Sequence, residues 1–263
     1  MVRGLSFIGF ILIILFTLFV KGYAQDDVLR SYMFKGQDYL DKDQYLQAVE
    51  EFEKVLKINP DYPDVNKSLC YAYDGLTYIE KDSFYLRIYL NKAIYHCDKA
   101  ITIKPDSYTF ETMAGLCCVL GEHKKSIEYY EKAAEINSES EDKARDYNGI
   151  AKGYYFLGEY QKSIQYHNKT IELNPNDSKG YFGVGTCYLS LKQYGQAIGY
   201  LEKAIRLNPD YSRAYSAIGD VYYSLGRYKE AKENLLKAKE LFQKEGNQDF
   251  VRKMEEYLNK LPK

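Results

Sequence analysis

The sequence predicts an all-α solenoid of about six helical hairpins, closed by one C-terminal helix. Residues 178–211 recur when they are shifted by 34 positions in either direction, with several tyrosines in register, and such a period is the sign of a stacked-repeat fold. Within this unit one helix face follows the spacing i, i+3, i+4 and i+7: Tyr181, Val184, Gly185 and Tyr188. A second apolar-periodic stretch ends at Asn208 and Pro209, because proline cannot continue a helix.

Each unit is expected to be two antiparallel helices that approach closely. Small residues at Gly185 and Ala197 leave room for the helix backbones, and the tyrosines fill the space around them. One such hairpin has too little core to fold alone, so neighbouring units must cover it.

The pattern resembles the tetratricopeptide repeat (TPR) family. It consists of an aromatic, an aliphatic, a small residue and Tyr in the first helix, then Ala, aromatic or Leu, Ala and Pro in the second. The resemblance covers nearly the whole chain after residue 28. It implies a right-handed superhelical solenoid of helix-turn-helix repeats, whose first helices line a concave groove that holds a peptide or helix of a partner.

The repeat domain is assigned to residues 25–245, and a capping helix to residues 247–261, where apolar residues share one face. The expected repeats occupy residues 29–62, 63–106, 107–143, 144–177, 178–211 and 212–245.

Two repeats depart from the pattern. In the second, the closing prolines Pro60 and Pro105 lie 45 residues apart, and we expect the surplus around residues 77–89 to lengthen both helices. This extension is either a recognition feature or a tolerated insertion. The third repeat ends in the polar residues 137–142 without a proline, which predicts a solvated loop.

Residues 1–24 differ in composition from the repeats. Arg3 precedes an uncharged, apolar run at residues 5–20, and small residues precede a predicted cleavage after Ala24. These features favour a cleaved signal peptide and therefore an extracytoplasmic protein, either periplasmic, in the cell envelope or secreted. The alternatives are a membrane anchor formed by residues 5–20, with the repeats outside the cytosol or, in the reversed orientation, inside it.

Composition excludes several classes of function. The net charge of −1 arises from 36 basic and 37 acidic residues, so there is no overall field to attract nucleic acid. Recognised metal, nucleotide and nucleophile motifs are missing from the sequence. We therefore expect no enzyme, no cofactor and no nucleic-acid partner.

The cysteines are expected to be buried thiols that act as small apolar residues. They are Cys70, Cys97, Cys117, Cys118 and Cys187. The alternative is a disulfide between Cys70 and Cys97, which would join the two helices of the stretched repeat; the helix separation decides it.

The histidines predict no metal site. A zinc site of His96, Cys97, Cys117 and His123 would match no known ligand spacing. His167 occupies the place of Leu201 in the next repeat, so we expect it to pack in the core with one satisfied nitrogen. Glycosylation sequons, relevant only in a eukaryotic secretory pathway, begin at Asn66, Asn168 and Asn176.

The resemblance to TPR proteins assigns candidate partner-binding residues to the groove. They are Arg145, Asn148, Lys152, Tyr155, Lys179, Phe182, Thr186, Arg213, Asp220 and Tyr223. Arg145, Lys179 and Arg213 form a basic ladder at the repeat period, and the aromatic residues are typical anchors of interfaces. This set would suit an extended, acidic peptide, unless the ladder only reflects duplication of one ancestral unit. The lysine and asparagine clamp that binds chaperone tails in some relatives is absent.

Three hypotheses about function remain. The first is an exported scaffold that binds a protein or peptide in the groove. The second is a structural or self-associating module, and the third is an extracytoplasmic binder of a glycan or small ligand.

Overall fold

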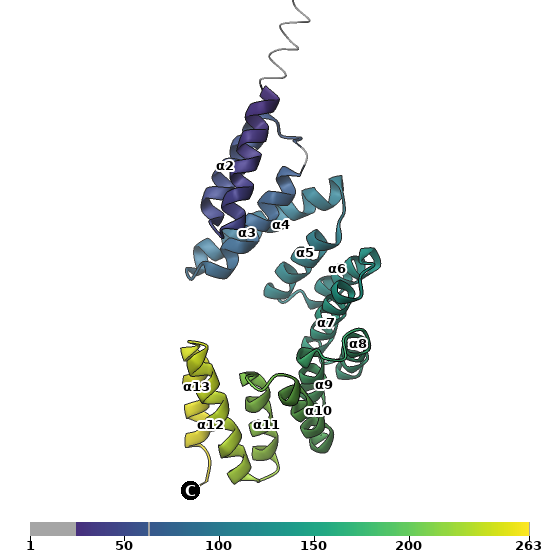
Figure 1. The fold of residues 1–263 in the computed structure, drawn as a ribbon, viewed down its shortest axis with the longest axis vertical. Helices are drawn as coiled ribbons and strands as arrows, with labels where there is room; N and C mark the ends of the chain where they lie inside the picture. The colour runs from purple at the N-terminus through teal and green to yellow at the C-terminus, as the bar shows by residue number, and fades with distance from the viewer. Residues whose placement is uncertain (1–24, 63, 263) are drawn as a thin grey trace, which may run out of the picture. The chain divides into compact units, whose positions relative to one another are not determined.

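The computed structural model describes residues 25–62 and 64–262, and the regular elements in these ranges are α-helices. The predicted all-α class is therefore confirmed, and consecutive helices form hairpins (Figure 1). The chain divides into two compact units, Met1–Pro105 and Asp106–Lys263.

The first unit contains helical residues 25–41, followed by three further helices. These are α2 (Tyr45–Ile58), α3 (Val65–Ile79) and α4 (Ser83–Ile103). Gly36 allows the first of these hairpins to close, because a Cβ atom there would lie 2.4 Å from the ring of Phe52. Phe52 is fully buried against Gly36, so the two helices approach closely at the small residue, as predicted.

As expected, both helices of the stretched repeat are longer than those of repeat five, which have 13 and 14 residues, but most of the surplus falls in α4. α3 has 15 residues and α4 has 21. The Glu80 carboxylate accepts hydrogen bonds from the backbone N–H groups of Lys81 and Asp82, and Asp82 accepts one from Phe84 N–H. This turn separates the two helices and caps α4, so most of the additional residues extend the second helix.

The second unit contains nine helices within residues 106–262. They are α5 (Ser107–Val119), α6 (His123–Ile136), α7 (Ser140–Phe156), α8 (Tyr160–Leu173), α9 (Ser178–Ser190), α10 (Tyr194–Leu207), α11 (Ser212–Ser224), α12 (Tyr228–Lys244) and α13 (Gln248–Asn259).

The turns inside the hairpins use one left-handed residue at the same repeat position. Gly158 has φ 77°, Lys192 has φ 59° and Gly226 has φ 71°. Glycine adopts this conformation without steric cost, whereas lysine does so at a penalty.

Neighbouring hairpins of the second unit share one apolar core. The cluster around Leu201 in α10 also includes Ile218 and Val221 of α11, so the second helix of one repeat packs on the first helix of the next. At Gly185 a Cβ atom would lie 2.7 Å from the Leu201 side chain, which explains the small residue there.

The predicted solvated loop at residues 137–142 is shorter than expected: residues 137–139 are non-helical, and Ser138 and Glu139 are exposed. α7 begins at Ser140, and Glu141 and Asp142 lie in its first turn, where negative charge is favourable next to the helix dipole. The side-chain Nδ2 of Asn137 donates to Asp146 Oδ2 at 2.7 Å, so Asn137 is held by the fold rather than by solvent.

α13 covers the last hairpin, as predicted for a capping helix. The rings of Phe242 in α12 and Phe250 in α13 stack with centroids 4.8 Å apart. Leu235, Val251 and Met254 are buried in the same cluster.

None of the helices within residues 25–62 and 64–262 has the length and apolar character needed to cross a bilayer. The predicted signal peptide or anchor lies outside these described residues.

Candidate functional site

A hollow of about 510 Å³ lies among α7, α8, α9 and the first turn of α11. We call it the basic hollow. It is lined by Asn148, Lys152, Tyr155, Phe156, His167, Lys179, Phe182, Gly183, Thr186, Tyr211 and Arg213.

The basic hollow gathers most of the residues that were assigned to the groove. Asn148, Lys152 and Tyr155 come from α7, Lys179, Phe182 and Thr186 from α9, and Arg213 from α11. These helices are the first helices of three successive repeats, so the same face recurs every 34 residues and the side chains meet.

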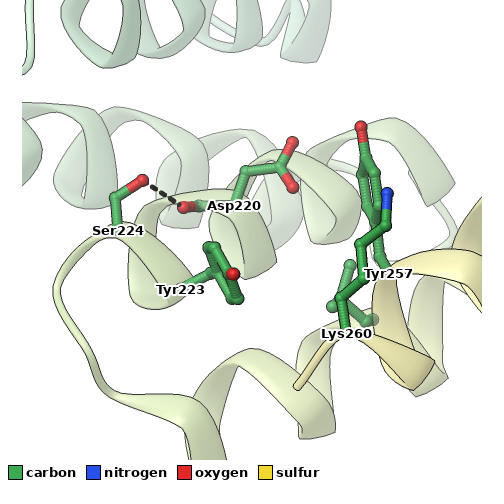
Figure 2. A pocket seen from close by; sticks show the side chains of 6 residues that line it. Asp220, Tyr223, Ser224, Tyr257 and Lys260 are labelled. Atoms are coloured by element: carbon green, nitrogen blue, oxygen red, sulfur yellow. Dashed lines mark hydrogen bonds between the residues drawn. The ribbon is translucent and has the colours of Figure 1, made fainter. Parts of the chain in front are cut away.

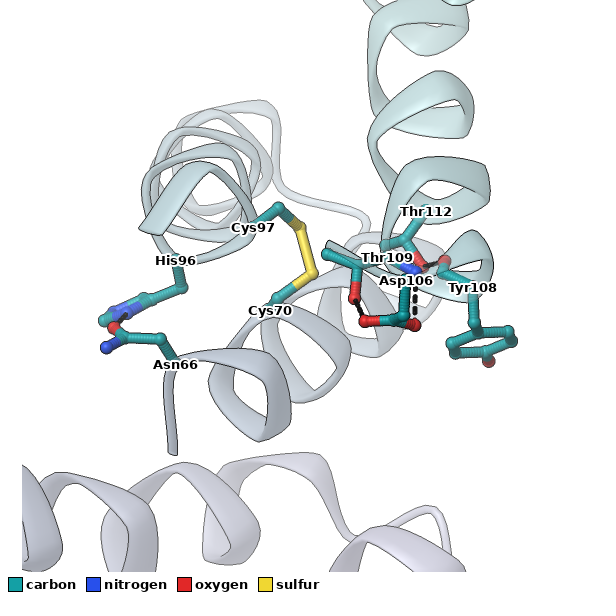
Figure 3. The surroundings of a disulfide bond; sticks show 8 residues. All are labelled: Asn66, Cys70, His96, Cys97, Asp106, Tyr108, Thr109 and Thr112. Carbon is teal, nitrogen blue, oxygen red and sulfur yellow. Dashed lines mark hydrogen bonds between the residues drawn. A yellow bond between two sulfur atoms is a disulfide. The ribbon is translucent and has the colours of Figure 1, made fainter. Parts of the chain in front are cut away.

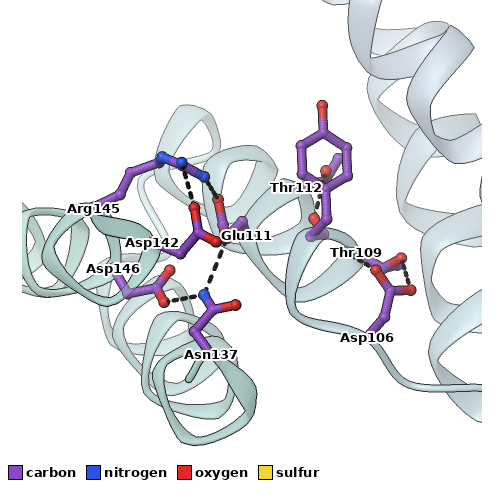
Figure 4. Close-up of polar contacts among 9 residues, drawn as sticks. Asp106, Thr109, Glu111, Thr112, Asn137, Asp142, Arg145 and Asp146 are labelled. Carbon is purple, nitrogen blue, oxygen red and sulfur yellow. Dashed lines mark hydrogen bonds and ion pairs between the residues drawn. The ribbon is translucent and has the colours of Figure 1, made fainter. Parts of the chain in front are cut away.

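Arg145 does not line the basic hollow, which breaks the predicted basic ladder. Its guanidinium donates to Glu111 Oε2 at 3.1 Å and to Asp142 Oδ1 at 2.6 Å (Figure 4). Arg145 therefore joins α7 to α5, and its charge is already neutralised within the protein.

The three cations of the basic hollow are exposed to solvent, and they make no ion pair with any residue that the structure describes. They are Lys152, Lys179 and Arg213. The nearby carboxylate of Asp177 instead caps α9, accepting hydrogen bonds from the backbone N–H groups of Lys179 and Gly180. Although the Lys152 side chain reaches solvent, the protein atoms packed around it displace part of its hydration and lower its pKa, and the positive charges of Lys179 and Arg213 lower it further.

Aromatic rings form the walls of the basic hollow. The rings of Phe182 and Tyr211 lie with centroids 5.0 Å apart, and burial raises the pKa of Tyr211 to about 12. The Tyr155 hydroxyl is held by Ser190, whose Oγ donates to it at 3.2 Å. The hollow therefore combines positive charge with rigid apolar surfaces.

Two buried polar atoms of the basic hollow have no hydrogen-bond partner among the described residues: Asn148 Oδ1 and His167 Nδ1. We expected one ring nitrogen of His167 to be hydrogen-bonded, but its Nδ1 has no such bond. Burial, together with the charge of Lys152, lowers the pKa of His167 to about 4, so the ring is neutral at pH 7.

His167 contributes to the basic hollow from a second helix, which the groove assignment missed. Gly183 gives its ring room, because a Cβ atom at this glycine would lie 2.2 Å from His167 Nε2. The sequence did carry a signal for this contact. The next repeat has Leu201 at the position of His167 and Ala217 at the position of Gly183, so a larger ring is matched by a smaller neighbour.

The remaining two groove candidates, Asp220 and Tyr223, line a separate hollow of about 290 Å³ beside the capping helix (Figure 2). Its other lining residues are Ser224, Leu235, Tyr257 and Lys260. Burial raises the pKa of Asp220 to about 6, while Lys253 lowers it.

In the first unit, Cys70 and Cys97 form a disulfide between α3 and α4 (Figure 3). The expectation of buried thiols is therefore wrong for this pair, because the stretched hairpin brings the two Cα atoms within 4.8 Å, a distance suited to a disulfide. Cys117, Cys118 and Cys187 are free.

His96 and Asn66 are engaged with each other beside the disulfide. His96 Nδ1 and Asn66 Oδ1 lie 2.9 Å apart (Figure 3), and both residues are buried. Asn66 is consequently not accessible as a glycan acceptor in the fold. Cys97 is part of the disulfide and His96 is engaged with Asn66, so these two residues do not support the zinc site considered from the sequence.

Family models of the tetratricopeptide repeat match most of the chain. One matches residues 107–176 and 181–244, a second matches residues 29–62, and a third matches residues 148–211. No curated protein matches the chain.

Solved TPR structures share the fold at low sequence identity. A tetratricopeptide repeat protein from Parabacteroides merdae aligns with a TM-score of 0.68 and 15% identity, over 90% of this chain and 94% of its own. The Pseudomonas aeruginosa pilF protein aligns with a TM-score of 0.61 and 15% identity, over 88% and 99%.

YrrB, which is described as a TPR protein with an unusual peptide-binding site, aligns with a TM-score of 0.51 and 18% identity, over 73% of this chain and 93% of its own. Helical hairpins, a capping helix and repeat models along both units agree, and the chain belongs to the tetratricopeptide repeat family.

Proposed function

We propose that this chain is an exported, non-enzymatic scaffold that binds a segment of a protein partner in the basic hollow. One observation carries the proposal: Lys152, Lys179 and Arg213 line a solvent-accessible hollow beside aromatic walls and have no ion-pair partner among the described residues. Arg145, which follows the same repeat spacing as Lys179 and Arg213, is instead paired within the fold. The fold shared with YrrB, whose site binds peptide, supports a peptide as the occupant.

Two observations support export. The apolar residues 5–20 precede the repeat domain, and disulfides such as Cys70–Cys97 persist in oxidising compartments outside the cytosol. The proposed location is the periplasm, the cell envelope or the extracellular space, with a retained anchor at residues 5–20 as the alternative.

The proposal of a non-enzymatic role rests on the sequence, which carries no recognised catalytic motif. The aromatic walls alone would also suit a glycan. Three unpaired cations favour an anionic segment over a neutral sugar, and a self-associating module would not require them.

Affinity capture with the full chain tests this function. We expect Lys179→Glu/Arg213→Glu to lose partners that the wild type captures from extracts of its own cells, because the charge of the basic hollow is reversed. The matched control is Lys229→Glu/Lys232→Glu, which makes the same charge change on exposed residues of α12. Identical partners for the wild type and the hollow variant would refute the proposal.

A further inference from the structure

The hollow of about 290 Å³ beside the capping helix, which we call the C-terminal hollow, carries two opposite charges. It lies where α11 and α12 meet α13. Tyr223, Leu235 and Tyr257 form its apolar walls, while Asp220 and Lys260 supply a carboxylate and an ammonium group. The partner site proposed in the basic hollow uses neither of these charges.

The carboxylate of Asp220 is open to a ligand. Asp220 is partly exposed, and its carboxylate forms no hydrogen bond or ion pair with any residue in the described ranges; its backbone oxygen alone accepts from Ser224 Oγ (Figure 2). The pKa of Asp220 of about 6 leaves it ionised at pH 7. Because the protein packed around it has removed part of its hydration, this carboxylate gains more from a cationic partner than a fully exposed one does.

A positive group lies across the C-terminal hollow. Lys260 is exposed and has no ion pair with the residues that the structure describes; its Nζ lies 5.7 Å from the centroid of the Tyr257 ring. Figure 2 shows the Asp220 carboxylate on α11 and the Lys260 ammonium group on α13 directed to the same side of the helices. Lys253 also lies 5.7 Å from the Tyr257 centroid, so a purely cationic ligand would meet two like charges. A ligand that carries both an ammonium group and a carboxylate matches Asp220 and Lys260 together.

The walls and the volume restrict the rest of the ligand. The Tyr223 ring is 46% exposed, and Leu235 belongs to the core cluster of α12 and α13, so an aliphatic side chain would pack on apolar surface there, which is favourable. The volume of about 290 Å³ lies just below the usual range of about 300–1,000 Å³ for drug-sized ligands. A single small molecule therefore suits this hollow better than a longer segment.

We propose that the C-terminal hollow binds a free α-amino acid with an apolar side chain, its ammonium group at Asp220, its carboxylate at Lys260 and its side chain against the two tyrosine rings. This inference goes beyond the scaffold function, because both the site and the ligand are different. The site is confined to the last repeat: the two preceding repeats have Thr186 and Lys152 at the position of Asp220, and the capping helix follows the last repeat alone.

Four probes with one side chain test the two charges of the ligand. They are leucine, N-acetylleucine without the ammonium group, leucinamide without the carboxylate, and N-acetylleucinamide with neither charge. Ligand-observed NMR titration of the full chain at pH 7 should show leucine binding at least about fivefold more tightly than each of the others, since hydrogen bonds to charged groups are the stronger ones. N-acetylleucinamide binding as tightly as leucine would identify a peptide-like ligand and overturn the proposal, as would the absence of leucine binding.

Variants of the chain test the two residues. Asp220→Asn and Lys260→Gln each keep the approximate shape and remove one charge, so each should weaken leucine binding at least about fivefold. Asp220→Asn should bind leucine no better than N-acetylleucine, and Lys260→Gln no better than leucinamide. The matched controls Glu233→Gln and Lys229→Gln, at exposed positions of α12, should bind as the wild type does. Unchanged affinity of both hollow variants, with an unchanged midpoint of thermal unfolding, would overturn the proposal.

This test is independent of the scaffold function. Lys179→Glu changes the charge of the basic hollow and should leave leucine binding at the wild-type level. A loss of leucine binding in this variant would place the amino acid in the basic hollow and overturn its assignment to the C-terminal hollow. Loss of cellular partners in the basic-hollow variant, by contrast, bears on the scaffold function alone.

Discussion

At the scale of single residues, Asp146 is a buried carboxyl group with incomplete hydrogen bonding. It is 0% exposed, and its Oδ2 accepts from Asn137 Nδ2 at 2.7 Å (Figure 4). Its Oδ1 has no partner among the described residues. Burial raises the pKa of Asp146 to about 7; the bond from Asn137 lowers it, and the charges of Glu111 and Asp142 raise it.

Replacing this carboxyl should stabilise the protein most at high pH. The pKa of Asp146 is higher in the folded state than the ordinary value near 3.9, so the folded state binds the extra proton and its stability falls as pH rises from about 4 to 7. Asp146→Asn keeps an oxygen acceptor for Asn137 Nδ2 and removes this pH-dependent loss of folding stability. Urea unfolding should show a gain at pH 8 that exceeds the gain at pH 5 by about 2 kcal/mol; an equal gain at both pH values would contradict the pKa.

The contact between Gly183 and His167 gives a second prediction at this scale. Gly183→Ala should lower the free energy of unfolding by about 1–3 kcal/mol, because the added Cβ would lie 2.2 Å from the ring. Adding His167→Leu should recover most of this loss, since Leu201 and Ala217 pack together in the next repeat. The control Gly199→Ala, where nothing lies within 4 Å, should stabilise by about 0.5–1 kcal/mol. Denaturant titration measures all four proteins, and no rescue by leucine would disprove the steric account.

At the scale of helices, the disulfide joins α3 to α4 across the longest hairpin described. Cys70 and Cys97 are 27 residues apart in sequence. A crosslink across a segment of this length restricts the unfolded chain and, on the chain-entropy model, stabilises by about 3–4 kcal/mol.

Cys70→Ala/Cys97→Ala should therefore lower the midpoint of thermal unfolding, whereas Cys118→Ala, at a free and only partly buried thiol, should change it little. Thiol titration of the denatured, unreduced wild type should find three free thiols, belonging to Cys117, Cys118 and Cys187. Five free thiols in protein from its native compartment would contradict the bridge.

Helix hairpins were predictable because their signal is repeated in the sequence, but helix ends were not. Residues 137–142 have the composition of a loop and of a capped helix start alike. The start of α7 at Ser140 depends on Glu111 and Asp146, which hold Asn137 and Arg145 from outside the segment. Such tertiary partners are not visible in a local pattern.

At the scale of the whole molecule, the repeat period explains both the success and the limits of the site prediction. Lys179 and Arg213 stand at one position of successive first helices and Lys152 at another, and all three, which the resemblance to TPR proteins assigned to the groove, line the basic hollow. Arg145 follows the same spacing but faces Glu111, a residue of the divergent third repeat. His167 lies on a second helix, outside the positions that the family pattern assigns to the groove.

The central claim is that the basic hollow, rather than another face of the repeats, holds the partner. Site-specific photocrosslinking of the full chain in its own cells tests it most directly, with a photoreactive phenylalanine at Phe182 in the hollow and at the exposed Leu236 on α12 as the control. The account predicts partner adducts from position 182 that disappear with Lys179→Glu/Arg213→Glu, and none from position 236. Adducts from position 236 alone, or from both positions regardless of the charge reversal, would contradict it.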